Sequence, residues 1–351
     1  GNHGTFEEQL GFSGGTNAYG YHLSFERSDT EGILKTNSDF SNTTIASRFD
    51  FAPSEKLELT TTLRYNDSRF HHPTGGAGDR FDPLDPNQYL DLRRLMIGPR
   101  VLYEPFTWWR HKLQLGLVNE WRTFRDPEDG FGIDPYGSFV STAGERRISA
   151  DYSSDLFLPS LLGILPTWTV GLYVEDEQLT QRSDSAGLRE RVSPSRNAQS
   201  LYSQLLLQWS EMLFVTSGFR LDDGSTYGTH VNPRVSAAFI LPGLKTKFRG
   251  GFSKGLKAPS FVDNFGTGST FYQGNPDLSP EESTSWEIGV DQPVEFQALS
   301  AELNVTYFST EFRDMIAFVF REGPDFLNVQ KARSRGVEFG GRLYFSHGIS
   351  A

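Results

Sequence analysis

The sequence predicts an all-β fold, an antiparallel transmembrane β-barrel. Apolar and polar residues alternate along most segments, which is the period of a strand with one apolar and one polar face. Short turns and long polar loops also alternate along the chain. One rim of the sheet is therefore tight and the other carries long loops, as in outer-membrane barrels.

The composition limits the class of protein. The chain has 351 residues, 22% of them charged and 37% hydrophobic, with a mean hydropathy of -0.44. No window approaches the ~18 consecutive apolar residues of a membrane helix, whereas the strands of a membrane barrel are only half apolar. The lack of cysteine removes disulfides, thiolate metal sites and cysteine nucleophiles. A net charge of -11 argues against a nucleic-acid partner.

Taken in order, the chain contains about fifteen strands of roughly 9 to 17 residues. The clearest alternation lies in 299–307 and 337–345, where apolar residues are separated by charged, polar or glycine residues. Five earlier segments show it as well: 19–26, 57–65, 112–117, 147–156 and 247–253. We assign their apolar faces to lipid and their charged faces to the lumen, where charges of both signs can pair across neighbouring strands.

The connections separate a membrane barrel from a soluble sandwich, whose strands would also alternate. Short turns are expected near 14–15, 52–55, 104–106, 210–211, 242–243 and 292–294. Long polar loops are expected at 28–42, 70–89, 124–143, 182–197, 222–230, 255–280 and 320–330. Tryptophans near both kinds of connection favour two aromatic girdles, although tryptophan also packs at the ends of sandwiches. This asymmetry favours the membrane barrel.

One motif connects the longest of these loops to a strand. Asn275-Pro276-x-Leu278-x-Pro280-Glu281-x-Ser283-x-x-x-Glu287-x-Gly289 closely resembles the barrel signature of TonB-dependent outer-membrane receptors. Neighbouring segments resemble the same family in the same order: Gly218–Asp222, Asn232–Ser236, Phe252–Phe261, and Asn328, Ala332 and Arg333 before Gly336-Val337-Glu338. The detailed resemblance runs from Gly218 to Phe345. Upstream of Gly218, only the succession of hairpins, with alternating short turns and long loops, matches the family.

The motif also has a physical rationale. Pro276 and Pro280 stiffen the descent from loop to strand, and proline at a strand start costs no ladder hydrogen bond. Glu287 lies on the lumen phase, opposite to that of Trp286 and Ile288.

The resemblance implies a plugged barrel of about 22 strands, of which residues 1–351 would supply the second to about the sixteenth. We therefore expect a barrel fragment without the plug domain. The family takes up scarce nutrients such as ferric siderophores or cobalamin, captured by extracellular loops and driven by the TonB complex through the plug. The expected location is the bacterial outer membrane, in contact with lipid and lipopolysaccharide.

For a small chelate, we expect contacts from aromatic and arginine residues in the long loops. The candidates are Arg80, Phe81, Tyr89, Arg125, Phe131, Tyr136, Tyr227, Phe261, Phe265, Phe271 and Tyr272. Carboxylates in one loop, Asp126, Glu128 and Asp129, suggest a Ca²⁺ site, and a hydrated anionic surface is the alternative. No other cofactor is expected.

The sequence does not suggest an enzyme. Gly11-Phe12-Ser13-Gly14-Gly15 fits a nucleophile elbow, but another strand follows at once, so a tight hairpin is expected. No catalytic residue is assigned. A passive porin-like or structural outer-membrane barrel and a soluble all-β adhesin are the rival interpretations.

Overall fold

The structure is a computed structural model that describes residues 3–74, 79, 81–82, 84–129, 137–266, 273–296, 299–319 and 325–345. These residues form one antiparallel sheet of 16 strands and one short helix. The elements are β1 (Phe6–Gly15), β2 (Tyr19–Thr30), β3 (Phe40–Ser54), β4 (Leu57–His71), β5 (Tyr89–Phe106), β6 (Trp109–Asp126), β7 (Phe139–Phe157), β8 (Ile164–Ser185), β9 (Leu188–Val192), β10 (Ser195–Trp209), β11 (Leu213–Gly224), β12 (Gly228–Ile240), β13 (Lys247–Lys257), α1 (Phe261–Phe265), β14 (Glu281–Phe296), β15 (Leu299–Phe318) and β16 (Phe326–Phe345).

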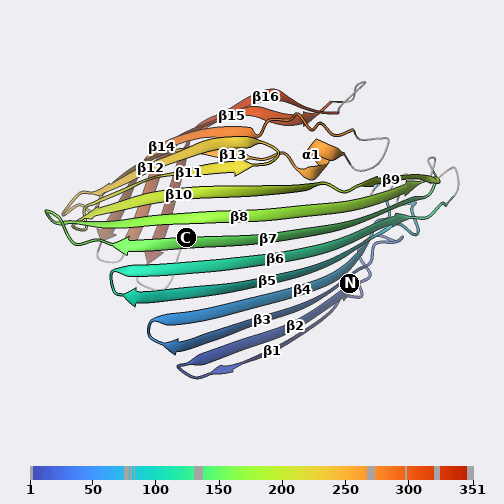
Figure 1. Ribbon diagram of the computed structural model, residues 1–351, viewed down its shortest axis with the longest axis horizontal. Coiled ribbons are helices and arrows are strands. Elements are labelled where there is room, and N and C mark those ends of the chain that lie inside the picture. Colours follow the sequence, from blue (N-terminus) through green and yellow to red (C-terminus); the bar gives the residue numbers. More distant parts are fainter. Residues whose placement is uncertain are drawn as a thin grey trace.

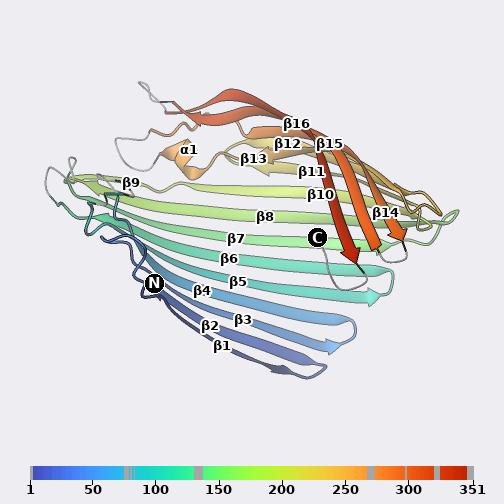
Figure 2. The same ribbon diagram turned by 180° about the vertical axis from the view of Figure 1, so that it is seen from behind.

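The sheet is a single curved layer (Figures 1 and 2). Each strand pairs with the next along the chain, except that β9 pairs only with β8, and β8 then pairs with β10. The path begins at β1 and ends at β16, and within the described residues these two strands do not pair, so the sheet is not closed. This confirms the all-β, antiparallel and incomplete barrel, with 15 strands along the path once β9 is set aside.

The apolar rows lie on the outside of the curved sheet and remain exposed. Val290, Val305 and Phe339 lie side by side on three neighbouring strands. Phe339 is 80% exposed and Val305 43%. Apart from prolines, the buried apolar side chains among the described residues are only Leu179, Phe261 and Leu278. No second layer of described residues therefore covers these rows, which argues against a soluble sandwich.

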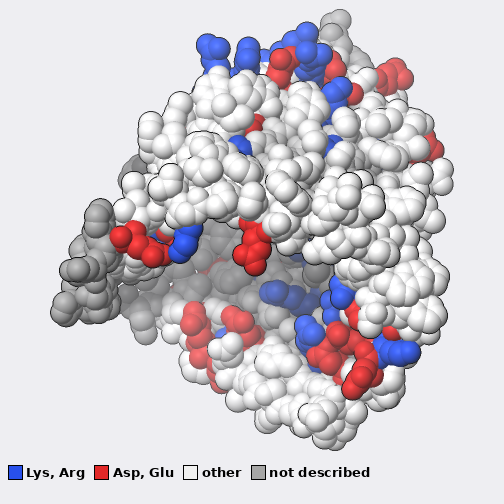
Figure 3. Space-filling view, turned by 90° about the vertical axis from the view of Figure 1, so that its left-hand side faces the viewer, with Lys and Arg blue, Asp and Glu red and all other residues white. Residues whose placement is uncertain are grey.

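Charged side chains gather toward the concave side. Figure 3 looks at the sheet from its short-turn end, and many of the charged groups in view lie around the hollow, whereas much of the outer wall is uncharged. Several of these charges pair across strands, as the sequence suggested. Arg100 binds Glu58 at 2.7 Å, and Arg249 binds Asp291 at 3.2 Å. The helix α1 is one turn long, and no helix among the described residues is both long and apolar enough to cross a bilayer.

Aromatic residues mark both rims of the outer face. Near the short-turn rim, the Trp108 ring stacks on Phe106 at 5.4 Å and on Trp109 at 5.8 Å. Toward the long-loop rim, Trp286 packs against Tyr307 at 5.2 Å. Indole and phenol rings favour the headgroup level of a bilayer.

Three expected connections are wrong. The long loop expected at 222–230 is a turn of three residues, because β11 runs to Gly224, which pairs with Gly228 at the start of β12. The turn near 292–294 does not form, because β14 continues to Phe296 and pairs with β15. Pro293 lacks a backbone N–H, yet it pairs in the ladder opposite Glu302, so the proline does not end the strand. Much of the loop expected at 182–197 is also strand. β8 runs to Ser185, and Ala186 and Gly187, both with positive φ, form a two-residue turn into β9.

Candidate functional site

A polar network covers the concave face of β10, β11 and β12. Arg220 lies between Tyr202 and Asn232 in the register of these strands. The carboxylate of Asp222 accepts hydrogen bonds from Arg220 Nε at 2.6 Å, Ser200 Oγ at 2.7 Å and Asn232 Nδ2 at 2.9 Å. Asp222 is 9% exposed, so the network holds a nearly buried charge with its partners in place. The arginine is thereby fixed against the wall.

Tyr202 lies flat on the wall because a glycine makes room for it. A Cβ atom at Gly171 would lie 2.1 Å from the Tyr202 ring. The phenol hydroxyl donates to Asp151 Oδ1 at 2.7 Å, which fixes the far end of the side chain. The Arg220 guanidinium lies 5.9 Å from the centre of the same ring. A flat ring beside a guanidinium offers a surface for a planar or anionic group.

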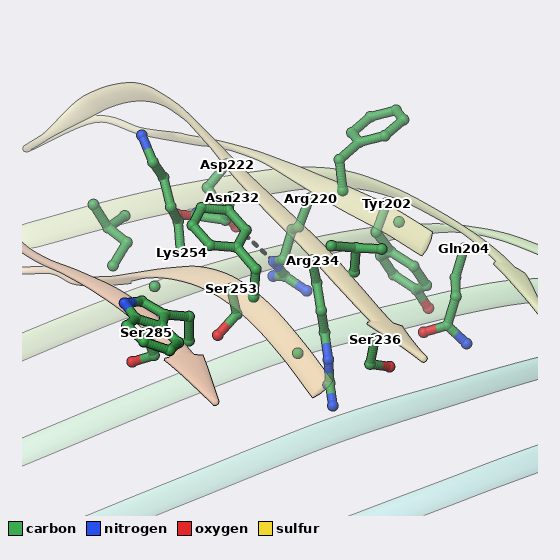
Figure 4. A pocket seen from close by; sticks show the side chains of 18 of the residues that line it. Tyr202, Gln204, Arg220, Asp222, Asn232, Arg234, Ser236, Ser253, Lys254 and Ser285 are labelled. Carbon is green, nitrogen blue, oxygen red and sulfur yellow. Dashed lines mark hydrogen bonds and ion pairs between the residues drawn. The ribbon is translucent and has the colours of Figure 1, made fainter. Parts of the chain in front are cut away.

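Beside this network is a cavity of about 1010 Å³. Arg234 of β12 extends into it (Figure 4). Small residues surround this side chain: Gly218, Ser236, Gly251, Ser253 and Ser285. Arg234 is exposed, and within the described part of the chain it forms no ion pair. A guanidinium with free donors can bind a carboxylate or a similar anion in bidentate fashion.

The loop after β13 turns inward above this region and begins with α1. Ser260 caps the helix, accepting a hydrogen bond from Asp263 N at 3.1 Å, while Asp263 accepts one from Ser260 N at 2.7 Å. Phe261 is only 7% exposed and lies under the guanidinium of Arg196, 4.6 Å from ring centre to Cζ. Arg196 also donates to the carbonyl oxygen of Pro259 at 2.7 Å. One arginine of β10 therefore fixes the start of the loop.

Arg196 is itself held by a buried carboxylate. Glu177 of β8 is 1% exposed and forms ion pairs with both Arg196 and Arg147. Burying a charge is unfavourable unless it is paired, and two guanidinium groups pair this one. No pattern in the sequence predicts this arrangement, since its members come from β7, β8, β10 and the long loop.

Asn275 fixes the other end of the loop. Its side-chain Nδ2 donates to the carbonyl oxygen of Phe326 at 2.9 Å. Its backbone N–H donates to the carbonyl oxygen of Asp263 at 2.7 Å. This motif residue therefore links the helix α1 to the first residue of β16.

A second asparagine holds the same segment a few residues further on. The side-chain amide of Asn328 forms hydrogen bonds with the backbone N–H and the carbonyl oxygen of Ser279, each at 2.9 Å. Leu278, which precedes this serine, is 3% exposed. The motif residues of the loop are thus attached to β16 and packed inward.

The remaining motif residues belong to the strands. Glu281 accepts hydrogen bonds from Lys257 Nζ and from Ile316 N, both at 2.8 Å. Glu287 lies 3.5 Å from Arg249 on the lumen side. Of the two motif prolines, Pro276 is exposed and Pro280 is buried. On β14, Ser283 lies opposite Gly255, and Gly289 lies under the side chain of Arg249. On β16, Gly336 lies beside Phe308, Val337 faces outward, and Glu338 lies opposite Thr306.

The predicted ligand residues are only partly brought together. Tyr227 lines the cavity beside Arg234, and burial raises the pKa of its phenol. Phe265 is 36% exposed on α1, whereas Phe261 is covered by Arg196. Phe81 is 79% exposed in its loop. The other candidates, Arg80, Phe131, Tyr136, Phe271 and Tyr272, lie outside the described residues.

Two candidates lie on strands rather than in loops. Tyr89 begins β5 and pairs in register with Arg125 of β6. Both share the phase of Ile97 and Leu117, which is the outer face. The Arg69 guanidinium covers the Tyr89 ring at 4.6 Å. The side chains of Tyr89 and Arg125 are therefore on the outer face, opposite to the lumen face that carries Arg220 and Arg234.

The predicted calcium loop is only partly described. Asp126 accepts a hydrogen bond from Gln88 Nε2 at 2.9 Å, and Asp129 is hydrogen-bonded to Asn87. Glu128 is exposed. In the described part of the chain, no group of three or more His, Asp or Glu residues has the geometry to hold a metal ion. Calcium binding stays a prediction.

Sequence reasoning missed the polar network itself. Arg220, Asn232 and Arg234 fall within the motif segments but are not among the expected ligand contacts. Their position on the lumen phase of β11 and β12 was the available signal, since it places three polar side chains on one face.

Comparison with known proteins relates the chain to transport receptors. The curated relatives include a probable TonB-dependent siderophore receptor, PirA, of Acinetobacter baumannii, which is 26% identical over 196 residues. That match covers 49% of this chain and 25% of the relative. The vitamin B12 transporter BtuB of Vibrio vulnificus is 25% identical over 179 residues, covering 50% of this chain and 27% of the relative.

The fold is similar to that of solved receptors. The crystal structure of the siderophore receptor PirA from Acinetobacter baumannii superimposes with a TM-score of 0.76 and 16% sequence identity, covering 98% of this chain and 58% of that one. This chain therefore spans little more than half the length of that receptor. The sequence model of the family described as "TonB dependent receptor-like, beta-barrel" matches residues 2–351. Over nearly its whole length, the chain thus belongs to the β-barrel family of TonB-dependent receptors.

Proposed function

We propose that this chain forms part of the barrel wall of an outer-membrane receptor that imports a small anionic metal chelate, such as a ferric siderophore or a corrinoid. The observation that carries this proposal is the cavity of about 1010 Å³ on the wall, with the exposed guanidinium of Arg234 inside it. Ligand pockets for molecules of several hundred daltons commonly measure about 300–1,000 Å³. Two relatives, named as a siderophore receptor and a vitamin B12 transporter, agree with this ligand class.

The ligand would first meet the long-loop rim and then the cavity. Phe81, Phe265 and Tyr227 supply aromatic surface along this route. Arg220 and Arg234 supply positive charge deeper in the lumen. A chelate with carboxylate or catecholate groups can stack on the rings and pair with the guanidinium groups.

Import also needs energy and a membrane. We propose that the TonB complex supplies the energy through a plug domain, and that lipid and lipopolysaccharide contact the outer face. Both belong to the whole receptor, of which this chain is part. The proposed role is transport without catalysis.

The test is uptake by the full-length receptor in cells that lack their own copy of its gene. Cells receive a panel of ⁵⁵Fe-labelled siderophores and ⁵⁷Co-labelled cobalamin, with and without a functional TonB protein. We expect TonB-dependent uptake of one ligand class. Arg234→Gln should weaken ligand binding about 10-fold or more, the usual cost of losing a charged hydrogen bond.

A matched variant controls for general effects on the barrel. Arg48→Gln also removes a lumen-facing guanidinium, but this one is paired with Asp50 at 2.7 Å and lies outside the cavity. Ligand affinity should stay unchanged in this variant. Uptake that does not depend on TonB would instead favour a passive porin-like barrel, and retention in aqueous buffer without detergent would favour a soluble adhesin.

Calcium is a separate proposal for the loop that contains Asp126, Glu128 and Asp129. Hard carboxylate oxygens suit Ca²⁺, and a hydrogen bond already joins one of these carboxylates, Asp129, to Asn87. Isothermal titration of the full-length receptor with CaCl₂, compared with the Asp126→Asn and Asp129→Asn double variant, tests it. Equal heats in the two proteins would exclude the site.

A further inference from the structure

The wall splits between β12 and β13. The ladder that joins these strands begins at Ile240 and Lys247 and ends at Arg234 and Ser253. Beyond this point β12 continues to Gly228 along β11, while β13 continues to Lys257 along β14. The two strands therefore diverge toward the long-loop rim. Pro233, the first residue of β12 beyond the ladder, has no N–H to offer to a neighbour.

The split leaves backbone groups without a ladder partner on both sides. They belong to 228–233 of β12 and 254–257 of β13. Unsatisfied N–H and C=O groups are costly in a hydrocarbon environment, so a polar group has to meet them. The level of the split is indicated by Trp286, which lies opposite Phe252 on the outer face and packs on Tyr307. Such ring pairs favour the headgroup level.

The cavity at the split is lined from both faces of the wall. Arg220, Asn232 and Arg234 line it on the lumen side. Residues of the outer phase line it as well: Ser203, Phe219, Val235, Phe252, Lys254, Leu256 and Trp286. Apart from Lys254 and Ser203 these outer residues are apolar. The outer mouth of the cavity thus combines an apolar surface with one positive charge.

Lys254 and Arg234 lie at opposite openings of the cavity, Lys254 at the outer opening and Arg234 at the lumen opening. In Figure 4 their side chains point to opposite sides of the strands. Lys254 is exposed, and in the described part of the chain its ammonium group forms no ion pair. An unpaired cation directly above apolar side chains is complementary to an anionic headgroup that carries acyl chains. A basic or uncharged peptide strand would match the open backbone but not the charge.

We propose that the outer mouth of this split binds a phosphorylated membrane lipid. The lipid phosphate contacts Lys254 and the open backbone of β13, and an acyl chain lies along Val235, Phe252 and Trp286. This inference rests on the outer-membrane location given under the proposed function. It adds a lipid site on the outer face that is separate from the nutrient route through the lumen.

The experiment uses the full-length receptor in a neutral detergent and native mass spectrometry. The probes are bis-phosphorylated lipid A and the same lipid after removal of both phosphates. We expect the phosphorylated form to bind more tightly. Lys254→Gln should weaken its binding about fivefold, since one lysine near an anionic lipid surface contributes about 1 kcal/mol. Lys254→Glu should weaken it further.

Two control variants distinguish this site from a general attraction to basic residues and from the nutrient route. Arg146→Gln removes an exposed cation of the outer phase on β7, between Asn119 and Gln178 and away from the split, and should leave lipid binding unchanged. Arg234→Gln removes the cation at the lumen mouth and should lower nutrient uptake while lipid binding persists. The lipid site and the nutrient route can therefore fail independently.

Three results would overturn the lipid site. Equal loss in Lys254→Gln and Arg146→Gln would indicate only a general attraction between lipid and the basic residues of the surface. Equal binding of lipid A with and without phosphates would remove the role of Lys254. Displacement of the lipid by the imported nutrient would assign the whole split to the transport route.

Discussion

Asn328 holds Ser279 by both backbone groups, accepting from its N–H at 2.9 Å and donating to its carbonyl oxygen at 2.9 Å. The same amide donates to the carbonyl oxygen of Asp314 at 2.6 Å. A single side chain of β16 therefore joins the descending long loop to β15. An asparagine suits this position because only an amide offers an acceptor and two donors in one plane.

Replacing this amide should loosen the loop without unfolding the sheet. We expect Asn328→Ala to cost about 0.5–1.5 kcal/mol, the usual net contribution of a hydrogen bond, because its partners Ser279 and Asp314 are exposed to solvent. Limited proteolysis of the full-length receptor should show faster cleavage between α1 and β14. Asn328→Asp keeps the acceptor for Ser279 N but loses both donors. Its cleavage should therefore be faster than that of the wild type. If Asn328→Ala is cleaved at the same rate as the wild type, Asn328 does not hold the loop.

The buried carboxylate of Glu177 should matter far more than an exposed one. Glu177→Ala leaves Arg147 and Arg196 without their shared counter-charge, and removing one partner of a buried pair typically costs about 3–5 kcal/mol. The temperature at which the folded band disappears in electrophoresis measures this loss. Asp50→Ala breaks the more exposed pair with Arg48 and should cost at most about 1 kcal/mol. Similar losses in the two variants would refute the distinction.

The contact between Gly171 and Tyr202 can be tested by a double-variant cycle. Gly171→Ala places a methyl group 2.1 Å from the ring, so the ring must leave the wall and give up its hydrogen bond to Asp151. We expect a loss of about 1–3 kcal/mol. Tyr202→Ser removes the obstacle, so adding Gly171→Ala to that variant should cost little more. Additive losses would show that the contact is not the cause.

Stability of the loop after β4 should fall in acid. Burial lowers the pKa of His72 below its ordinary 6.5, outweighing the opposite effect of Asp85, and His71 lowers it further. The unfolded loop then binds a proton more readily than the folded one, so stability is retained above pH 6.5 and lost as the pH falls below it. Hydrogen exchange at about pH 7.5 and about pH 5.5, on either side of that pKa, measures this. His72→Phe, which keeps a ring beside Phe70, should remove the pH dependence.

The sheet itself could be predicted because its signal is local. Alternation along 299–307 and 337–345 indicated both the strands and their outer faces, and the structure pairs Val305 with Phe339 on that face. The turn expected near 292–294 was wrong because β14 continues through Pro293, where only one N–H is missing from the ladder. Local patterns do not report such tolerance.

The site depended on contacts that are distant in sequence. Phe261 was expected to face a ligand, but Arg196, 65 positions earlier, covers its ring. Tyr89 was assigned to a loop although its strand extends beyond the apolar band and carries it to the outer face. Neither outcome follows from residue type or spacing, because each depends on which strands become neighbours and how far they extend.

The ladder between β12 and β13 has only seven residue pairs, whereas the ladder between β13 and β14 has eleven. Among the ladders on the path from β1 to β16 in the described residues this one is the shortest, so its few cross-strand hydrogen bonds make it the most compliant line along that path. If a receptor of this kind is pulled or strained during transport, the strain concentrates along this line. Strands β1 to β12 and strands β13 to β16 then move as two stiff panels joined by a weak hinge.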